Sequence, residues 1–175
     1  MHSSNPYPTK VGSTDRTNLV RLAANPVISC GISNIAAAAS KLEIFRIPNL
    51  SIYDSSWSFM SCGNLTIIIG DFTTYNTVTS NTFRGCIKLT AIHMGIGGNC
   101  SVSFQDSPLL TYDSIKYTIE HARNTSAITI TVHPTTYAYL TGTTAPTTQV
   151  GGTTEEWQAL VTAATAKKIS FATTN

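Results

Sequence analysis

The chain has few ionisable side chains, with 11 Lys and Arg and 9 Asp and Glu, or 11% of its 175 residues. Soluble domains carry about 25%. The formal net charge is only +2 and the basic residues are scattered, which argues against a nucleic-acid partner. No apolar run approaches the roughly 18 residues of a membrane span. The segment 1–8 lacks a basic region followed by an apolar stretch, so no secretory signal peptide is visible.

Cysteine and histidine are also scarce, with four of each. No cysteine pair has the C-x-x-C spacing and no two histidines lie four residues apart, so the sequence predicts no metal site. Motifs for a catalytic serine, a bound phosphate or a dinucleotide are absent too. We therefore expect no catalytic residues and no cofactor. Cys62 and Cys86 are expected to be buried free thiols, although a bridge between them is sterically conceivable.

Hydroxyl groups supply the polarity that charges do not. The chain has 28 threonines and 18 serines, which fill 46 of the 175 positions. Hydrophobic residues make up 42% of the sequence, so wholesale disorder is not expected. A chain of this length suits one domain with a real core.

A short motif recurs from about residue 36. Each copy has an aromatic residue, a small Cys or Ser three positions later, and Leu three positions after that. The copies are Phe59–Leu65, Phe83–Leu89 and Phe104–Leu110, with a degenerate Ala36–Leu42 before them. Alternating apolar residues follow the first three leucines, which predicts strands at 42–47, 65–69 and 89–94. One such unit buries its apolar side chains only by stacking on its neighbours, so the repeat predicts parallel strands and a buried column formed by Leu42, Leu65, Leu89 and Leu110.

The sequence after Leu110 predicts a different arrangement. A helix is expected over 112–123, a strand over 127–132, and a short turn or helix from His133 to Leu140. A Thr/Gly-rich loop at 141–153 leads to a capping box between Thr153 and Glu156. The helix that follows (155–166) and a strand (169–172) are expected to cover the open end of the last repeat, with Trp157 buried.

The motif Phe-x-x-Cys-x-x-Leu-x-x-Ile resembles the BspA-like leucine-rich repeats, with Phe83–Ile92 as the closest match. These repeats are common in surface proteins of anaerobic gut and oral bacteria and in genes of their phages. The resemblance covers about residues 36–132. It implies an α/β repeat fold, namely a short right-handed leucine-rich-repeat solenoid with parallel strands, here with a C-terminal helix–strand cap. It also implies adhesion or recognition rather than catalysis.

These features predict a lead-in at 1–30, the leucine-rich-repeat solenoid at 31–133 and the cap at 134–175. The expected function is non-enzymatic binding or adhesion to a glycan or protein on a cell surface. The expected location is extracellular or virion-associated, without membrane insertion. The alternative is a self-associating structural subunit of a phage tail or other particle, which the small number of repeats and the absence of a visible secretion signal favour.

The predicted binding surface is the outward face of the repeat strands, since side chains alternate across a strand. The residues assigned to it are Glu43, Phe45, Thr66, Ile68, Thr90 and His93. Large apolar side chains such as Phe45 and Ile68 are costly in water, so a ligand, a second copy or the protein's own tail is expected to cover them. A second copy is favoured because a surface with little charge gives little repulsion between copies, which makes a homo-oligomer an expected possibility.

Overall fold

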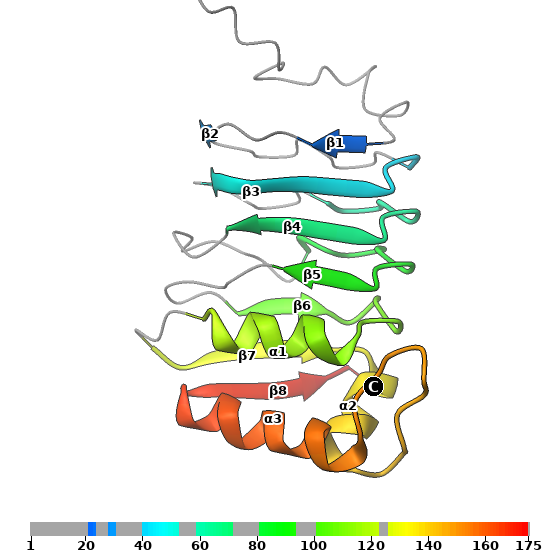
Figure 1. The fold of residues 1–175 in the computed structure, drawn as a ribbon, viewed down its shortest axis with the longest axis vertical. Coiled ribbons are helices and arrows are strands. Elements are labelled where there is room, and N and C mark those ends of the chain that lie inside the picture. The colour runs from blue at the N-terminus through cyan, green and yellow to red at the C-terminus, as the bar shows by residue number, and fades with distance from the viewer. Residues whose placement is uncertain are drawn as a thin grey trace, which may run out of the picture.

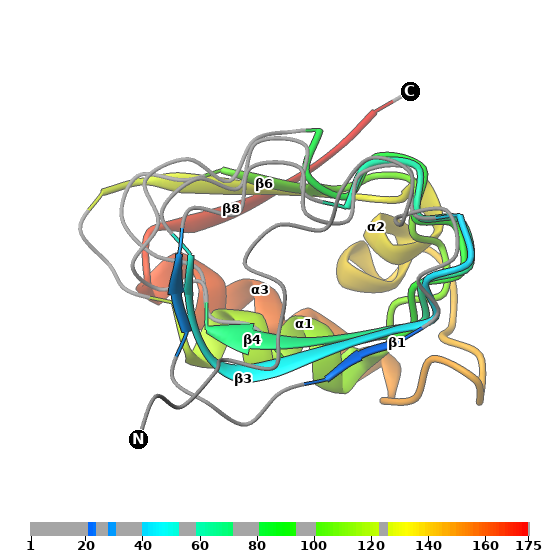
Figure 2. The ribbon, with the colours of Figure 1, turned by 90° about the horizontal axis from the view of Figure 1, so that it is seen from above.

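The computed structural model describes residues 21–23, 28–30, 40–52, 59–71, 81–93, 101–122 and 126–174. These residues form a mixed α/β fold in which both sheets are parallel. Figure 1 shows the strands stacked one above another along the longest axis of the molecule. Figure 2 shows strands of the two sheets on opposite sides of a shared interior.

The first sheet contains the repeat strands. Its strands are β1 (Arg21–Ala23), β2 (Ile28–Cys30), β3 (Ile44–Ile52), β4 (Ile67–Asp71) and β5 (Ala91–His93). Strand β3 pairs with β4 and β4 pairs with β5, all in parallel, so the predicted parallel order of the repeat strands is confirmed. Both β1 and β2 also pair with β3. Pairing in this sheet therefore begins before residue 31, where the repeat region was expected to start.

The residue after each repeat leucine joins one repeat to the next. The Thr66 N–H donates to the Glu43 carbonyl at 2.9 Å, and the Thr90 N–H donates to the Thr66 carbonyl at 3.0 Å. Thr111 continues the series by donating to the Thr90 carbonyl at 3.0 Å. These bonds place the preceding leucines above one another. All four are completely buried, as predicted: Leu42, Leu65, Leu89 and Leu110.

The inward and outward positions of the strands differ from the sequence expectation. Before each strand the chain turns inward at every third residue, because the Cys86 N–H donates to the Phe83 carbonyl and the Leu89 N–H donates to the Cys86 carbonyl, both at 3.2 Å. Each strand starts two residues after the repeat leucine. The next side chain to point inward is therefore the third residue after that leucine, not the second. Phe45 and Ile68 are consequently in the core with no exposed surface. The prediction that these two side chains face outward was wrong.

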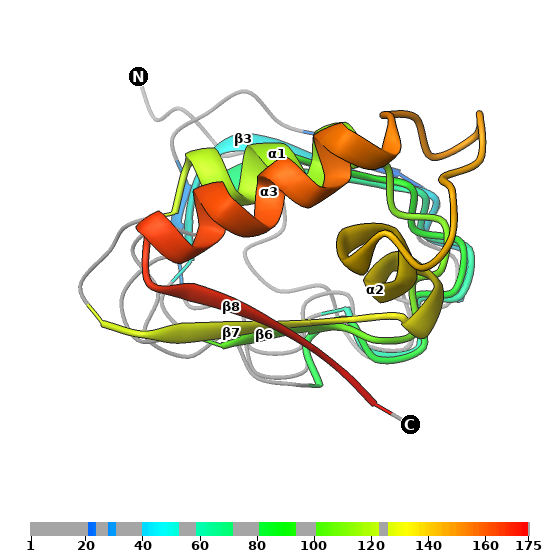
Figure 3. The same cartoon turned by 90° about the horizontal axis from the view of Figure 1, so that it is seen from below.

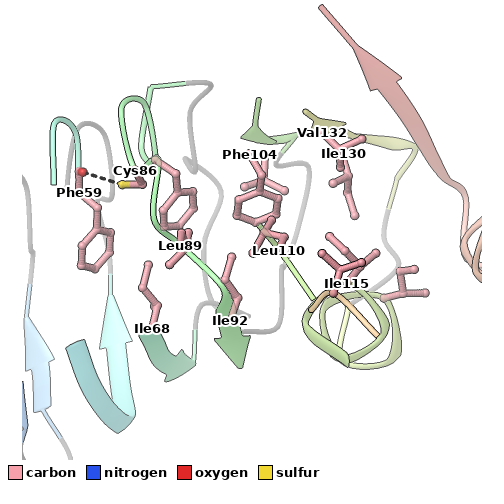
Figure 4. Packing of buried hydrophobic residues seen from close by; sticks show 14 of the residues in the cluster. Phe59, Ile68, Cys86, Leu89, Ile92, Phe104, Leu110, Ile115, Ile130 and Val132 are labelled. Atoms are coloured by element: carbon pink, nitrogen blue, oxygen red, sulfur yellow. Dashed lines mark hydrogen bonds between the residues drawn. The ribbon is translucent and has the colours of Figure 1, made fainter. Parts of the chain in front are cut away.

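The turns place their aromatic rings and the Cys86 thiol in the interior (Figure 4). The rings of Phe59 and Phe83 are stacked and nearly parallel, with centroids 5.6 Å apart, and the centroid of the Phe104 ring lies 5.1 Å from that of Phe83. The Cys86 Sγ donates to the Phe59 carbonyl at 3.1 Å. Cys62 and Cys86 are buried and unbridged, which confirms the prediction for these two thiols.

A helix takes the place of the next strand beside β5. Helix α1 (Tyr112–Glu120) begins at its N-cap Thr111, and the Ser114 side chain accepts a bond from the Ile92 N–H at 2.9 Å. The same hydroxyl donates to the Thr90 carbonyl at 3.1 Å. A serine side chain thus pairs with the backbone edge of β5, and α1 closes this edge of the sheet (Figure 1).

The second sheet and two further helices complete the fold. Strands β6 (Val102–Phe104), β7 (Ile128–Val132) and β8 (Ile169–Thr173) are parallel in that order. The sequence did not predict β6. Helix α2 (Pro134–Thr141) follows β7, and α3 (Thr154–Ala166) precedes β8. Figure 3 shows α2, α3 and β8 together at this end of the stack.

Trp157 anchors the C-terminal helix and strand. Its side chain is completely buried, and the centroid of its ring lies 5.7 Å from that of Tyr112 and 5.5 Å from that of Tyr139. The indole N–H donates to the Gly151 carbonyl at 2.9 Å. The predicted capping box of Thr153 and Glu156 is present. The prediction of a helix and a strand packed over this end, with Trp157 inside, is confirmed.

Candidate binding surface

The structure separates the six side chains that were predicted to bind. Phe45 and Ile68 belong to the core. Thr66 and Thr90 are half-buried, and their hydroxyls donate to the Glu43 and Thr66 carbonyls at 2.9 and 3.0 Å. These two threonines therefore hold neighbouring repeats together. Only Glu43 and His93 are exposed.

The outward-facing strand positions are those directly before and after the buried residues, such as Phe45 and Ile68. In the register of the sheet, Arg46 is level with Ile69, and Ile69 is level with His93. Arg46 and His93 are exposed, and Ile69 is half-buried. Neighbouring strands are about 4.8 Å apart, so these three side chains form a continuous row across the sheet.

Helix α1 extends this row. The ring of His93 stacks on that of Tyr117 with centroids 4.9 Å apart, and Tyr117 stacks on His121 at 3.8 Å. Tyr117 and His121 are four residues apart, so they lie on one face of the helical turn. We refer to Arg46, Ile69, His93, Tyr117 and His121 together as the outward row.

The orientation of the His121 ring follows from its hydrogen bond. Its Nδ1 lies 2.9 Å from the backbone carbonyl of Tyr117. A carbonyl oxygen only accepts, so Nδ1 carries the hydrogen of this bond. The other ring nitrogen, Nε2, is then the atom available to a ligand, as an acceptor in the neutral ring and as a donor in the charged one.

Both cations and carboxylates lie around the outward row. Besides Arg46, Lys116 lies on α1, where its Nζ is 3.9 Å from the Glu120 carboxylate. The Lys167 Nζ donates to the Ile119 and Glu120 carbonyls at 3.0 and 2.6 Å. This lysine offsets the partial negative charge at the end of α1. Two further carboxylates are exposed nearby. Glu43 is three residues from Arg46 along the chain, or about 10 Å in an extended strand, and Asp113 precedes Tyr117 by four residues on α1.

A second surface feature is an uncharged hollow of about 430 Å³ at the opposite end of the stack from β1. It lies between α2, α3 and β8, which are seen together in Figure 3. The residues that line it are Tyr137, Leu140, Thr141, Gln158, Val161, Thr162 and Phe171. Val161 is one of the two exposed large hydrophobic side chains of the described residues, with 37% of its surface exposed.

The described residues offer little reactive chemistry. Burial raises the pKa of the Cys86 thiol, with a smaller contribution from Cys62, so the thiol stays protonated. No group of three or more His, Cys, Asp or Glu in the described ranges is arranged to hold a metal ion. No helix in the same ranges is long and apolar enough to cross a membrane.

The sequence prediction missed four of the five residues in the outward row. The sequence did contain a signal for Tyr117 and His121, because they lie four residues apart in the predicted helix and therefore share a face. Arg46 and Ile69 each lie four positions after a repeat leucine, whereas the prediction assigned the third position to the outward face. The meeting of β5 with α1 that joins His93 to Tyr117 has no local signal. No protein-family model, curated protein or solved structure matches this chain.

Proposed function

We propose that this chain is a non-enzymatic binding module that recognises an extended glycan or protein on a cell surface through the outward row. The scaffold we propose is the short right-handed leucine-rich-repeat solenoid that the sequence motif resembles. The parallel register of β3, β4 and β5 supports this assignment. One face of such a stack collects equivalent side chains from every repeat, which suits an extended ligand.

The proposal is supported by the continuity of the outward row. The outward row runs without interruption from β3 over β4 and β5 to α1, and its exposed members are a guanidinium and two imidazoles. Exposed side chains of mixed cationic and aromatic character are typical of recognition surfaces. The location that goes with this proposal is extracellular or on a virion.

The test is to screen the full chain against arrays of cell-surface glycans and proteins, and then to alter the surface. Ile69→Asp with His93→Asp places two carboxylates in the centre of the outward row. We expect at least tenfold weaker binding to any array ligand that the parent protein binds. Val161→Asp, an exposed apolar residue on α3, is the matched control and should leave binding unchanged. Equal loss in both variants would show that the outward row is not the binding surface.

The second candidate is a structural subunit of a phage tail or other particle that associates with copies of itself. The uncharged hollow between α2, α3 and β8 favours it, because an exposed valine beside neutral side chains presents no repulsion to a second copy. Light scattering at micromolar concentration should then give a mass above the monomer, and Val161→Glu should return the mass to that of a monomer. A monomer in the parent protein would eliminate this candidate.

A further inference from the structure

We propose that the uncharged hollow between α2, α3 and β8 binds a short neutral saccharide. This second site shares no residue with the outward row, so it goes beyond the function proposed above. The volume of the hollow, about 430 Å³, lies within the range of about 300–1,000 Å³ found for small-molecule pockets. Interfaces between proteins are instead broad patches of about 800 Å² on each partner.

Helices α2 and α3 build the walls of the hollow with the same residue spacing. The α2 residues that line it are spaced i, i+3, i+4 and are Tyr137, Leu140 and Thr141. The α3 residues that line it have the same spacing and are Gln158, Val161 and Thr162. Each set therefore occupies one face of its helix, and Phe171 of β8 lies between them in the lining. Side chains carried by helices and a strand keep a fixed geometry, as a binding site requires.

The end of α2 holds one of these side chains in place. Gly142 caps α2 in the left-handed conformation, with a φ of 69°. A side-chain carbon at Gly142 would collide with the Gln158 amide, so the glycine leaves the space that this amide occupies. The Gln158 side chain is thus packed against the α2 terminus at the edge of the hollow.

The polar groups of the hollow are neutral and have unused hydrogen-bonding capacity. Among the described residues, the Gln158 amide, the Tyr137 hydroxyl and the Thr162 hydroxyl have no hydrogen-bond partner. The Thr141 hydroxyl donates to the Tyr137 carbonyl at 3.1 Å, which leaves its oxygen free to accept. Amides and hydroxyls both donate and accept, and so do the hydroxyls of a sugar. None of the described lining residues carries a charge, so a charged ligand would lose water here without gaining an ion pair.

The apolar groups of the hollow fit the ring of a sugar. Tyr137 and Phe171 are half-buried, and Leu140 is buried with 2% of its surface exposed. The faces of aromatic rings are weakly negative and attract the C–H groups on the face of a sugar ring. A hydrocarbon chain would cover the Gln158 amide and the two hydroxyls without bonding to them, which is costly. A neutral saccharide meets both the apolar and the polar side chains.

The experiment titrates the full, isotope-labelled chain with maltose, cellobiose, lactose and chitobiose and follows its backbone amide resonances by NMR. Glucuronate is the charged comparison. We expect at least one disaccharide to shift the resonances of α2, α3 and β8, and glucuronate to leave them unchanged. This readout needs no variant, so it tests the site even if a substitution prevents folding.

Two double variants then test the polar groups. Gln158→Leu with Thr162→Val keeps the size of both side chains and removes their hydrogen bonds, so we expect at least tenfold weaker binding. Gln149→Leu with Thr165→Val makes the same chemical changes at exposed positions outside the hollow. This matched control should change binding less than twofold. Equal thermal unfolding midpoints establish that the variants remain folded.

Three results would overturn the inference: no shifts with any of the four disaccharides, equal shifts with glucuronate, or equal loss in the two double variants. Shifts centred on His93 and Tyr117 would place the sugar on the outward row, which supports the proposed function and eliminates the second site. A mass above the monomer that Val161→Glu returns to the monomer would show that a second copy occupies the hollow. That result would overturn the inference as well.

Discussion

At the scale of single residues, hydroxyl groups form the polar side-chain contacts that charged groups form in most domains. The Thr66 N–H and hydroxyl both donate to the Glu43 carbonyl, and Thr90 repeats this arrangement on Thr66. Ser107, which stands where Cys86 stands one repeat earlier, donates from a fully buried position to the Cys86 carbonyl at 3.0 Å. A hydroxyl in these places satisfies the backbone at little desolvation cost, whereas a charge would need water. This accounts for a sequence rich in Thr and Ser and poor in ions.

Trp157 gives the largest expected change in stability for a single residue. Trp157→Ala removes a completely buried ring that contacts Tyr112 and Tyr139 and leaves a cavity. We expect the free energy of unfolding to fall by about 3–5 kcal/mol in a urea titration. Trp157→Phe keeps most of the volume and should lose less. A loss below about 1 kcal/mol for the alanine variant would show that the C-terminal helix is not anchored by this ring.

The Cys86 thiol is expected to be chemically silent until the protein unfolds. Burial raises its pKa, and its hydrogen already bonds to the Phe59 carbonyl. Because the thiolate is the reactive form, iodoacetamide at about pH 8 should leave Cys86 unmodified in the native protein. The same treatment in guanidinium chloride should alkylate it, as peptide mass spectrometry would show. Rapid alkylation of the native protein would mean that the turn around Cys86 opens readily.

At the scale of elements, α1 is the place where the repeat ends. A fourth repeat strand beside β5 would supply backbone partners, and here the Ser114 hydroxyl supplies one instead. Ser114→Ala leaves the Ile92 N–H buried without this acceptor, so we expect a loss of about 1–3 kcal/mol in the free energy of unfolding. Ser170→Ala removes an exposed hydroxyl from β8 and should cost under about 0.5 kcal/mol. Equal effects of the two changes would contradict this role of Ser114.

The start of α3 gives a prediction about pH. Hydrogen bonds from its own backbone N–H and from the Thr153 hydroxyl lower the pKa of the Glu155 carboxyl from its ordinary value of 4.5. A lowered pKa in the folded state stabilises the protein above the unfolded-state pKa, and this contribution disappears as the pH falls through the folded-state pKa. Glu155→Gln should therefore lower the thermal midpoint near neutral pH, and the two midpoints should converge as the pH falls through the lowered pKa of Glu155. A constant difference at all pH values would contradict the assignment.

The sequence was most informative about which helices and strands are present. It was least informative about which side chains of each strand face inward. The leucine spacing correctly predicted neighbouring parallel strands, and Thr153 with Glu156 correctly marked the start of α3. Periodicity alone did not show where the three-residue turns give way to the two-residue strand alternation, which is why Phe45 and Ile68 were placed on the wrong face. Strand β6 has only three residues and all are buried, so it has no alternation to detect.

At the scale of the whole molecule, the outward row depends on contacts that no local pattern encodes. His93 and Glu43 were predicted to be exposed and are. The meeting of His93 with Tyr117 arises because α1 occupies the strand position beside β5, and only the assembled stack shows this. The handedness of the stack, its repeat class and its domain limits stay predictions.

The closed end of the stack provides the last prediction. Strand β7 lies between β6 and β8, and Tyr139 of α2 packs against Trp157 of α3. A chain that ends at Thr153 lacks α3 and β8, so one backbone edge of β7 and the buried Leu140 lose their cover. Uncovered strand edges and apolar side chains promote association between chains.

We expect the shortened chain to have a larger mass than the full chain by light scattering, and to lose its cooperative thermal transition. Val161→Ser in the full chain, which changes the surface of the same end without removing its cover, should keep that transition. A shortened chain that unfolds cooperatively at the mass of the parent would show that the repeats need no cover at this end.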